Sequence, residues 1–325
     1  MRQGAFTATA ASALVIAGLS LAFASSAARA DDQPMTPWGV PDLSGNYAEF
    51  TTAPLERPEE LGNQEFFTAD QFEEYAKRKL EAADQDDETI PGTQADVHYD
   101  MGTFRLSENE GITSLNMRTS IVNRPANGRI PPLTAAAAAR RDEYNDWRKG
   151  HEYDGPEYRS LTERCIVWPS TLAPILPRGY NSNLQIFQSP GYVVIRGEMG
   201  DPRVIPTDGR KLPDNLLPQW NGTSVGRWDG DTLVVETSGF DPKTAWRGAT
   251  GNMHVEERIR RVDDDTLEYA FTVTDPDTWA EPWGGVYPLT AMDGLLFEYA
   301  CTEGNYGMAN ILSGARAKER EAAGE

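Results

Sequence analysis

The second half of the chain consists of short runs of alternating apolar and polar residues that are separated by tight turns. In residues 226–240, GRWDGDTLVVETSGF, an Asp-Gly pair separates two such runs. Alternation with a period of two predicts β-strands, and Asp-Gly or Pro-Gly between two runs predicts a hairpin. The pattern predicts nine strands, over residues 183–189, 192–199, 203–206, 224–228, 232–240, 253–262, 266–273, 285–292 and 295–301.

Nine strands joined in succession by short turns predict an antiparallel up-and-down meander. Such a sheet has to bury one face and remove its two edges, and closure into a barrel does both. We therefore expect a mainly β protein with a calycin- or lipocalin-like barrel, whose interior is filled by side chains or holds one small ligand. A two-layer sandwich is the alternative, because the number of strands does not determine closure.

The first half of the chain has a different pattern and predicts an N-terminal extension with two helices. Apolar residues recur at helical spacing after Thr68, and residues 133–150 are rich in alanine. One strand is also expected within residues 41–50. The predicted organisation is a wrapping segment over residues 31–180 followed by a barrel over residues 181–325.

The first thirty residues have the composition of a secretory signal peptide. Arg2 precedes an apolar run that is too short to span a bilayer, and the stretch ends with Ala28-Arg29-Ala30, which suits cleavage. Residues 1–30 are therefore predicted to be removed, and the protein is predicted to be periplasmic or secreted.

The chain is strongly acidic. Its 325 residues carry a formal net charge of −20, which repels nucleic acid and anionic lipid. No run after residue 30 is long and apolar enough for a transmembrane helix. We expect no nucleic-acid partner and no membrane partner.

Cys165 and Cys301 are the two cysteines of the chain. In an oxidising compartment they are expected to form a disulfide, with two buried free thiols as the alternative. Two cysteines and three histidines leave little material for a zinc site, and the chain has no nucleotide-binding glycine motif. We expect neither a metal nor an organic cofactor.

His254 is the first candidate for acid/base chemistry, because histidine titrates near neutral pH and this one lies in a predicted strand. Alternation places Glu256 and Arg258 on the same face as His254, and Val255 and Glu257 on the opposite face. In this interpretation His254 moves a proton and Glu256 orients it. The alternative is that this face is the solvated outside of the sheet, because charged residues are rarely buried.

A second set of side chains is expected to hold the ligand. Arg196 and Arg258 are candidates to stabilise an anion such as a phenolate or an enolate, although both suit the outer face as well. Aromatic residues are expected to line a pocket for a small, largely apolar ring. The candidates are Tyr180, Tyr192, Trp220 and Tyr269.

The segment GTSVG, residues 222–226, fits the G-x-S-x-G pattern with Ser224 in the position of a nucleophile. That motif requires a strand before the serine and a helix after it. Here a loop precedes the serine and a strand follows it. We therefore do not expect a serine hydrolase.

Several segments resemble those of a large family of secreted bacterial proteins. They cover most of the chain after the signal peptide and include PDLSGNY, GRIPPLT, GRWDGDTLVVETSGF, TVTDPDTW and YACTEGNYG. The resemblance implies a disulfide and a family pattern that contains His254, Glu257, Arg258 and Tyr269, so that Glu257 becomes a carboxylate candidate beside Glu256. Thr302 stands where family members often carry histidine, and residues 95–116 depart from the pattern, which points to a changed substrate or reaction.

These features predict an enzyme that works without a cofactor and performs acid/base chemistry of the lyase or isomerase type. Its expected substrate is a small aromatic compound, for instance a lignin-derived dimer, held inside the barrel. The alternative is a non-catalytic binding protein for a small hydrophobic ligand, because a fold alone does not determine function.

Overall fold

The computed structural model describes residues 33–85, 116–168, 171–177, 183–244 and 246–324. The signal peptide predicted for residues 1–30 lies outside this part of the chain. The described residues form one compact unit.

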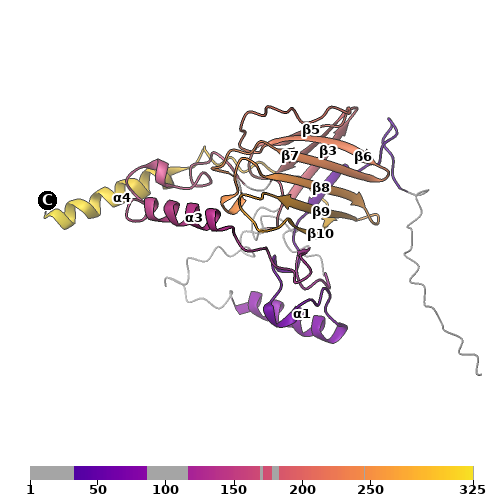
Figure 1. The fold of residues 1–325 in the computed structure, drawn as a ribbon, viewed down its shortest axis with the longest axis horizontal. Helices are drawn as coiled ribbons and strands as arrows, with labels where there is room; N and C mark the ends of the chain where they lie inside the picture. Colours follow the sequence, from indigo (N-terminus) through magenta and orange to yellow (C-terminus); the bar gives the residue numbers. More distant parts are fainter. Residues whose placement is uncertain (1–32, 86–115, 169–170, 178–182, 245, 325) are drawn as a thin grey trace, which may run out of the picture. The chain divides into compact units, whose positions relative to one another are not determined.

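A ten-stranded antiparallel sheet forms the centre of this unit (Figure 1). Hydrogen-bonded neighbours follow the order β5-β4-β3-β1-β10-β9-β8-β7-β6, and β2 pairs with β10 outside this path. Most consecutive strands are neighbours, so the predicted antiparallel meander is confirmed. The strands are β1 (Gly45–Ala48), β2 (Val122–Arg124), β3 (Asn183–Ser189), β4 (Tyr192–Gly197), β5 (Arg203–Pro206), β6 (Thr223–Asp229), β7 (Thr232–Ser238), β8 (His254–Arg261), β9 (Thr266–Thr274) and β10 (Trp283–Ala291).

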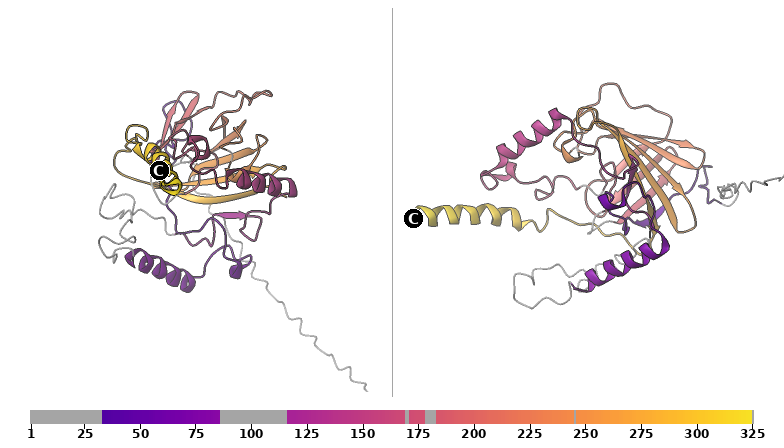
Figure 2. Two further views of the ribbon diagram at one scale, coloured as in Figure 1. Left: turned by 90° about the vertical axis from the view of Figure 1, so that its left-hand side faces the viewer. Right: turned by 60° about the horizontal axis from the view of Figure 1, so that its bottom comes forward.

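The sheet is curled until it is nearly closed into a barrel (Figure 2). β5 and β6 are the two ends of the hydrogen-bonded path. They lie beside each other, although no backbone ladder joins them in the described residues. The predicted barrel is therefore confirmed, and we call the junction between β5 and β6 the seam.

Gly226 allows β6 to come close to β5 at the seam. A Cβ atom on Gly226 would lie 3.0 Å from the Cγ2 atoms of both Ile205 and Thr207, which is tighter than ordinary contact. Glycine lets a neighbouring backbone approach because it has no side chain to make room for. The seam is thus closed by side chains of one strand that pack on the backbone of the other.

One strand of the sheet comes from the N-terminal extension. β1 lies between β3 and β10, and Tyr47 pairs with Leu184 on one side and with Ala291 on the other. The strand expected within residues 41–50 is therefore confirmed. It connects the two hairpin-rich parts of the sheet, because β3 and β10 do not pair with each other directly.

The strand predicted for residues 295–301 does not form. β9 and β1 already occupy the two sides of β10, so the segment after Gly294 finds no free edge there. The segment has no ladder, and the side chains of Leu295 and Phe297 are 76% and 70% exposed. This prediction was wrong because alternation shows which segments suit a sheet, but not whether an edge is available.

Two of the three α-helices of the described residues lie in the N-terminal extension, as predicted. They are α1 (Ala69–Gln85) and α3 (Ala135–Arg148). Thr68 and Thr134 precede them, and each accepts a hydrogen bond from the backbone N–H of the third helical residue. The third helix, α4 (Tyr306–Ala323), is not among the predicted elements.

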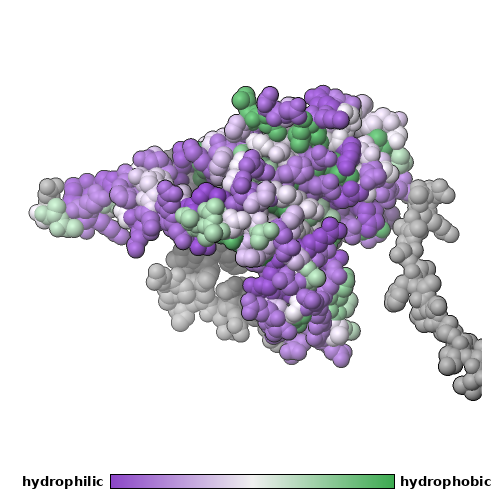
Figure 3. Space-filling view, in the orientation of Figure 1, coloured by the Kyte–Doolittle hydropathy of each residue, from purple (hydrophilic) through white to green (hydrophobic). Residues whose placement is uncertain are grey.

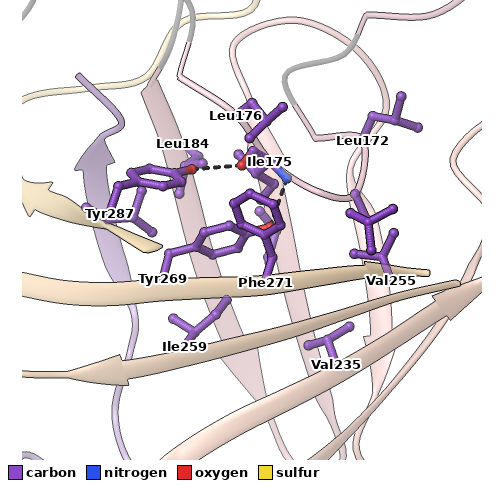
Figure 4. Close-up of a cluster of buried hydrophobic side chains, with 14 of the residues drawn as sticks. Leu172, Ile175, Leu176, Leu184, Val235, Val255, Ile259, Tyr269, Phe271 and Tyr287 are labelled. Carbon is purple, nitrogen blue, oxygen red and sulfur yellow. Dashed lines mark hydrogen bonds between the residues drawn. The ribbon is translucent and has the colours of Figure 1, made fainter. Parts of the chain in front are cut away.

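Residues 171–177, which we call the plug, pack inside the barrel. Leu172 and Ile175 belong to the same buried hydrophobic cluster as the inward-facing residues of the strands. Figure 4 shows Ile175 and Leu176 among strand side chains such as Leu184 and Tyr269. A buried loop needs partners for its backbone polar groups, so the barrel has to supply them.

A disulfide joins Cys165 and Cys301, whose Cα atoms are 5.7 Å apart. The predicted pairing is confirmed. It connects the segment that leads into the plug with the segment that precedes α4. None of the helices described is both long and apolar enough to cross a bilayer. The face of the molecule seen in Figure 3 is mostly hydrophilic.

Gly226→Val is expected to destabilise the protein by about 1–3 kcal/mol, because the new methyl groups would force β6 away from Ile205. Urea unfolding at pH 7 measures the change. Gly314→Ala in α4 is the control, because a Cβ atom there meets nothing within 4 Å. Equal stability of the Gly226→Val variant and the native protein would contradict close packing at the seam.

Candidate functional site

Glu257 points into the barrel from the middle of β8. Its neighbours on the same face are Val255 and Ile259, and all three residues are at most 1% exposed. A carboxylate is expensive to bury unless it is paired and hydrogen-bonded. The contacts of Glu257 therefore decide what the interior of the barrel can do.

Arg203 and Tyr269 supply those contacts. Arg203, on β5, donates from Nη1 to Oε1 of Glu257 at 2.9 Å and from Nη2 to Oε2 at 2.5 Å. Tyr269, on β9, donates from its hydroxyl to Oε1 at 2.7 Å. The side chains of Arg203 and Glu257 are 2% and 0% exposed, so this is a two-point ion pair shielded from water.

The ion pair crosses the seam, and hydroxyl groups of the strands between its partners extend it. Nη2 of Arg203 also donates to Oγ1 of Thr237 at 3.0 Å and to Oγ of Ser224 at 3.2 Å. The two hydroxyls lie 2.8 Å from each other. We call Arg203, Ser224, Thr237, Glu257 and Tyr269 the polar cluster. Ser224 lies within β6, so it does not occupy the turn of a nucleophile elbow.

Two tyrosines connect the polar cluster to the plug. The backbone N–H of Ile175 donates to the hydroxyl of Tyr269 at 2.8 Å. The hydroxyl of Tyr287 donates to the backbone oxygen of Ile175 at 3.1 Å. Figure 4 shows both tyrosines hydrogen-bonded to Ile175. The barrel thus presents one hydrogen-bond acceptor and one donor to the two consecutive peptide groups that meet at Ile175.

Burial controls the protonation of this site. Burial, followed by the negative charge of Glu257, raises the pKa of Tyr269 well above its ordinary value. Burial and the charges of Glu49 and Glu257 do the same for Tyr287. Burial lowers the pKa of the Arg203 guanidinium, but Glu257 outweighs this effect and the pKa is raised overall. Both phenols are therefore neutral and Arg203 is charged at neutral pH.

The face of β8 that was predicted to carry the chemistry points away from the polar cluster. His254, Glu256 and Arg258 alternate with the inward-facing Val255 and Glu257, so they lie on the outer face of the barrel. Arg258 donates there to Asp229 at 2.9 Å. The outer-face alternative is therefore the one that the structure supports for these three side chains.

The remaining predicted residues are also dispersed. Arg196 alternates with the buried Ile195 on β4, which places it on the outer face. Trp220 lies in the loop before β6 and is 39% exposed. Tyr192 lies at the start of β4, beside the β3–β4 turn. Tyr180 lies outside the described residues, so of the four aromatic candidates the structure places Tyr269 in the polar cluster.

Three residues of the interior were missed by sequence reasoning. They are Arg203, Tyr287 and Glu49, which follows β1 and is 0% exposed. Alternation carried a signal for two of them, because Arg203 shares a face with Ile205 and Tyr287 shares a face with Leu289. The strand of Arg203 has four residues, which is too short for alternation alone to identify its buried face.

The polar cluster can bind an oxygen atom and exchange a proton. Within the part of the chain described, Nε of Arg203 is a buried donor without a partner, so it is free to bind a ligand oxygen. Glu257 and Tyr269 supply a carboxylate and a neutral phenol that share a hydrogen bond. The described residues contain no group of three or more His, Cys, Asp or Glu side chains placed to hold a metal ion.

Arg203→Met is expected to destabilise the protein by about 3–5 kcal/mol, because it leaves the Glu257 carboxylate buried and unpaired. The double variant Arg203→Met/Glu257→Met should lose less than the sum of the two single changes. Arg258→Met is the control, because its partner Asp229 is 63% exposed and such pairs contribute less than about 1 kcal/mol. Chemical denaturation measures the free energy of unfolding of the double variant, of its two single variants and of Arg258→Met. Similar losses of stability for Arg203→Met and Arg258→Met would contradict a buried ion pair.

The free energy of unfolding is expected to fall as the pH rises above about 10, the ordinary pKa of tyrosine. Tyr269 and Tyr287 have raised pKa values in the folded protein, so the unfolded chain releases these protons first and is favoured at high pH. Urea unfolding between pH 8 and pH 11.5 gives the slope. Tyr287→Phe should reduce it, whereas Tyr144→Phe, at a residue 56% exposed, should not.

Comparison of the chain with protein-family models, with curated proteins and with solved structures found no match in any of the three. The resemblance of its segments to secreted bacterial proteins therefore stays a prediction.

Proposed function

We propose that the barrel is the ligand compartment of a periplasmic or secreted enzyme that performs acid/base chemistry on a small aromatic compound without a cofactor. The observation that supports this proposal is the position of Glu257, which is fully buried at the centre of the barrel between Arg203 and Tyr269. Buried carboxylates with specific partners are common among catalytic groups.

Each member of the polar cluster has a chemical role in this proposal. Glu257 accepts a proton from the substrate or returns one to it, and Tyr269 holds the carboxylate in place. Arg203 stabilises the phenolate or enolate that forms, through its unpartnered Nε–H. A reaction of the lyase or isomerase type fits these roles, because it needs proton transfer and charge stabilisation only.

The contacts of the plug indicate which polar groups a ligand would need. Tyr269 accepts from the backbone N–H of Ile175 and Tyr287 donates to its backbone oxygen, so the barrel offers one acceptor and one donor there. An aromatic ring with a hydroxyl group and a second oxygen substituent carries a donor and an acceptor as well, and the surrounding side chains are apolar. The ligand enters by taking the place of Ile175, so binding requires the plug to shift. A lignin-derived dimer is one aromatic compound of this kind.

The alternative function is non-catalytic binding of a small hydrophobic ligand. One observation favours it: both carboxylate oxygens of Glu257 are already bonded to Arg203. The carboxylate is thus already engaged, and buried ion pairs also serve purely to specify a fold. A binding protein would use the same compartment and leave its ligand unchanged.

Glu257→Gln is expected to lower turnover of aromatic substrates by about 100-fold or more while the affinity changes little, because the amide keeps the shape but cannot take up the proton. A panel of phenolic monomers and dimers is incubated with the protein, products are measured by mass spectrometry, and binding is measured by calorimetry. Glu268→Gln, on the solvent-exposed side of β9, is the matched control.

His254→Ala distinguishes the two faces of β8. The proposal expects this variant to keep its turnover, because His254 lies outside the barrel. Loss of turnover in His254→Ala together with full turnover in Glu257→Gln would overturn the proposal. Compounds that bind with high affinity and are never converted would support the non-catalytic alternative instead.

A further inference from the structure

A cleft lies beside the β3–β4 turn. Its volume is about 70 Å³, and it is lined by Trp38, Val40, Tyr192, Val193, Thr207 and Trp228 among others. Three of these six residues are aromatic. Tyr192 is the one aromatic candidate from the sequence that lies here, and the proposed reaction does not use the cleft.

The cleft is separate from the polar cluster. Tyr192 pairs with Pro206 at the end of β4 that follows the β3–β4 turn, whereas Arg203 pairs with Ile195 three residues further along β4. The buried pair of Val193 and Ile205 lies between these two positions. A ligand in the cleft therefore does not reach Glu257.

Backbone and side-chain bonds hold the aromatic walls in place. Trp38 lies in a tight turn in which the N–H of Gly39 donates to the oxygen of Thr36 at 3.0 Å. The amide of Gln188 fixes the chain that follows, because it accepts from the N–H of Leu43 at 2.6 Å and donates to the oxygen of Pro41 at 3.0 Å. Trp38 is thereby held at the barrel end while 39% of its surface stays exposed.

The three rings line one space without filling it. Among the stacked and edge-on ring pairs of the described residues, none joins two of Trp38, Tyr192 and Trp228. Three aromatic side chains around one space can offer it their electron-rich faces. A cation attracts such faces strongly, and cages of aromatic side chains bind quaternary ammonium groups.

The charge of the protein favours a cation over an anion here. The chain has a net charge of −20, which raises the local concentration of cations and lowers that of anions. Arg210 lies beside one wall of the cleft, and its guanidinium is 5.9 Å from the ring centre of Tyr192. Its charge is neutralised by Asp208, at 2.9 Å from Nε.

We propose that the cleft of Trp38, Tyr192 and Trp228 binds a quaternary ammonium group, such as the trimethylammonium head of a small choline-like compound. The volume of about 70 Å³ suits a compact head group. The aromatic and aliphatic walls supply cation–π attraction and apolar contact to the methyl groups. The lining also contains the polar side chains of Gln188, Ser189 and Thr207.

Choline and 3,3-dimethylbutan-1-ol test this proposal, because they have the same shape and differ in the charge of one atom. Binding to the full protein is followed by calorimetry and by tryptophan fluorescence at low salt. Choline is expected to bind at least about tenfold more tightly than its neutral counterpart. Equal binding of the two compounds would overturn the proposal, and so would binding of a neutral sugar such as methyl glucoside in preference to choline.

Substitutions locate the binding site. Trp38→Ala is expected to weaken choline binding at least about tenfold, whereas Trp38→Phe should keep most of it because an aromatic face remains. Trp147→Ala, at an exposed tryptophan of α3, is the matched control. Asp208→Asn should weaken choline binding and leave the neutral compound unaffected, because the charge of Arg210 is no longer neutralised. Unchanged choline binding in Trp38→Ala would place the site elsewhere and overturn the proposal.

Discussion

The ion pair between Arg203 and Glu257 is the interaction on which the rest of the barrel depends. The sheet ends at β5 and β6, and no ladder of backbone hydrogen bonds joins these strands in the described residues. Arg203 starts on β5 and reaches Glu257 on β8, with Thr237 and Ser224 bonded along the way. A side-chain bridge thus completes a barrel that the backbone leaves open. Close contact at Gly226 supports the same closure.

Closure of this kind has consequences for the interior. Burial, together with the negative charge of Glu257 and, for Tyr287, of Glu49, raises the pKa values of the neighbouring phenols. The neutral phenols of Tyr269 and Tyr287 are then able to satisfy the backbone of the plug at Ile175. The bridge, the tyrosines and the plug therefore form one connected unit. Any ligand that enters this compartment has to replace the hydrogen bonds between these tyrosines and Ile175 with its own.

The interior of the barrel and the cleft near Trp38 differ in the chemistry that they offer. Within the described residues the interior combines charge, phenols and an unpartnered Nε–H, which suits the aromatic ligand proposed above. The cleft combines aromatic walls with a neutralised ion pair, which suits the proposed ammonium group. The buried pair of Val193 and Ile205 lies between them. The two proposed sites therefore differ in position and in the charge that they prefer.

The sequence by itself predicted most of the strands and hairpins, the antiparallel meander and two of the three described helices, because these follow from local periodicity and turn residues. It favoured a barrel over a sandwich and a disulfide over two free thiols, and the tertiary structure decided both questions in that sense. Alternation also grouped Glu257 with Val255, away from His254. It did not decide which group faces inward, because both faces of β8 carry charges and only packing against distant strands selects one. For the same reason alternation did not identify Arg203, on its short strand, as an inward-facing residue. It also produced the wrong strand at residues 295–301, because β1, distant in sequence, occupies the edge of β10. Contacts between segments far apart in the chain are a property of the tertiary structure alone.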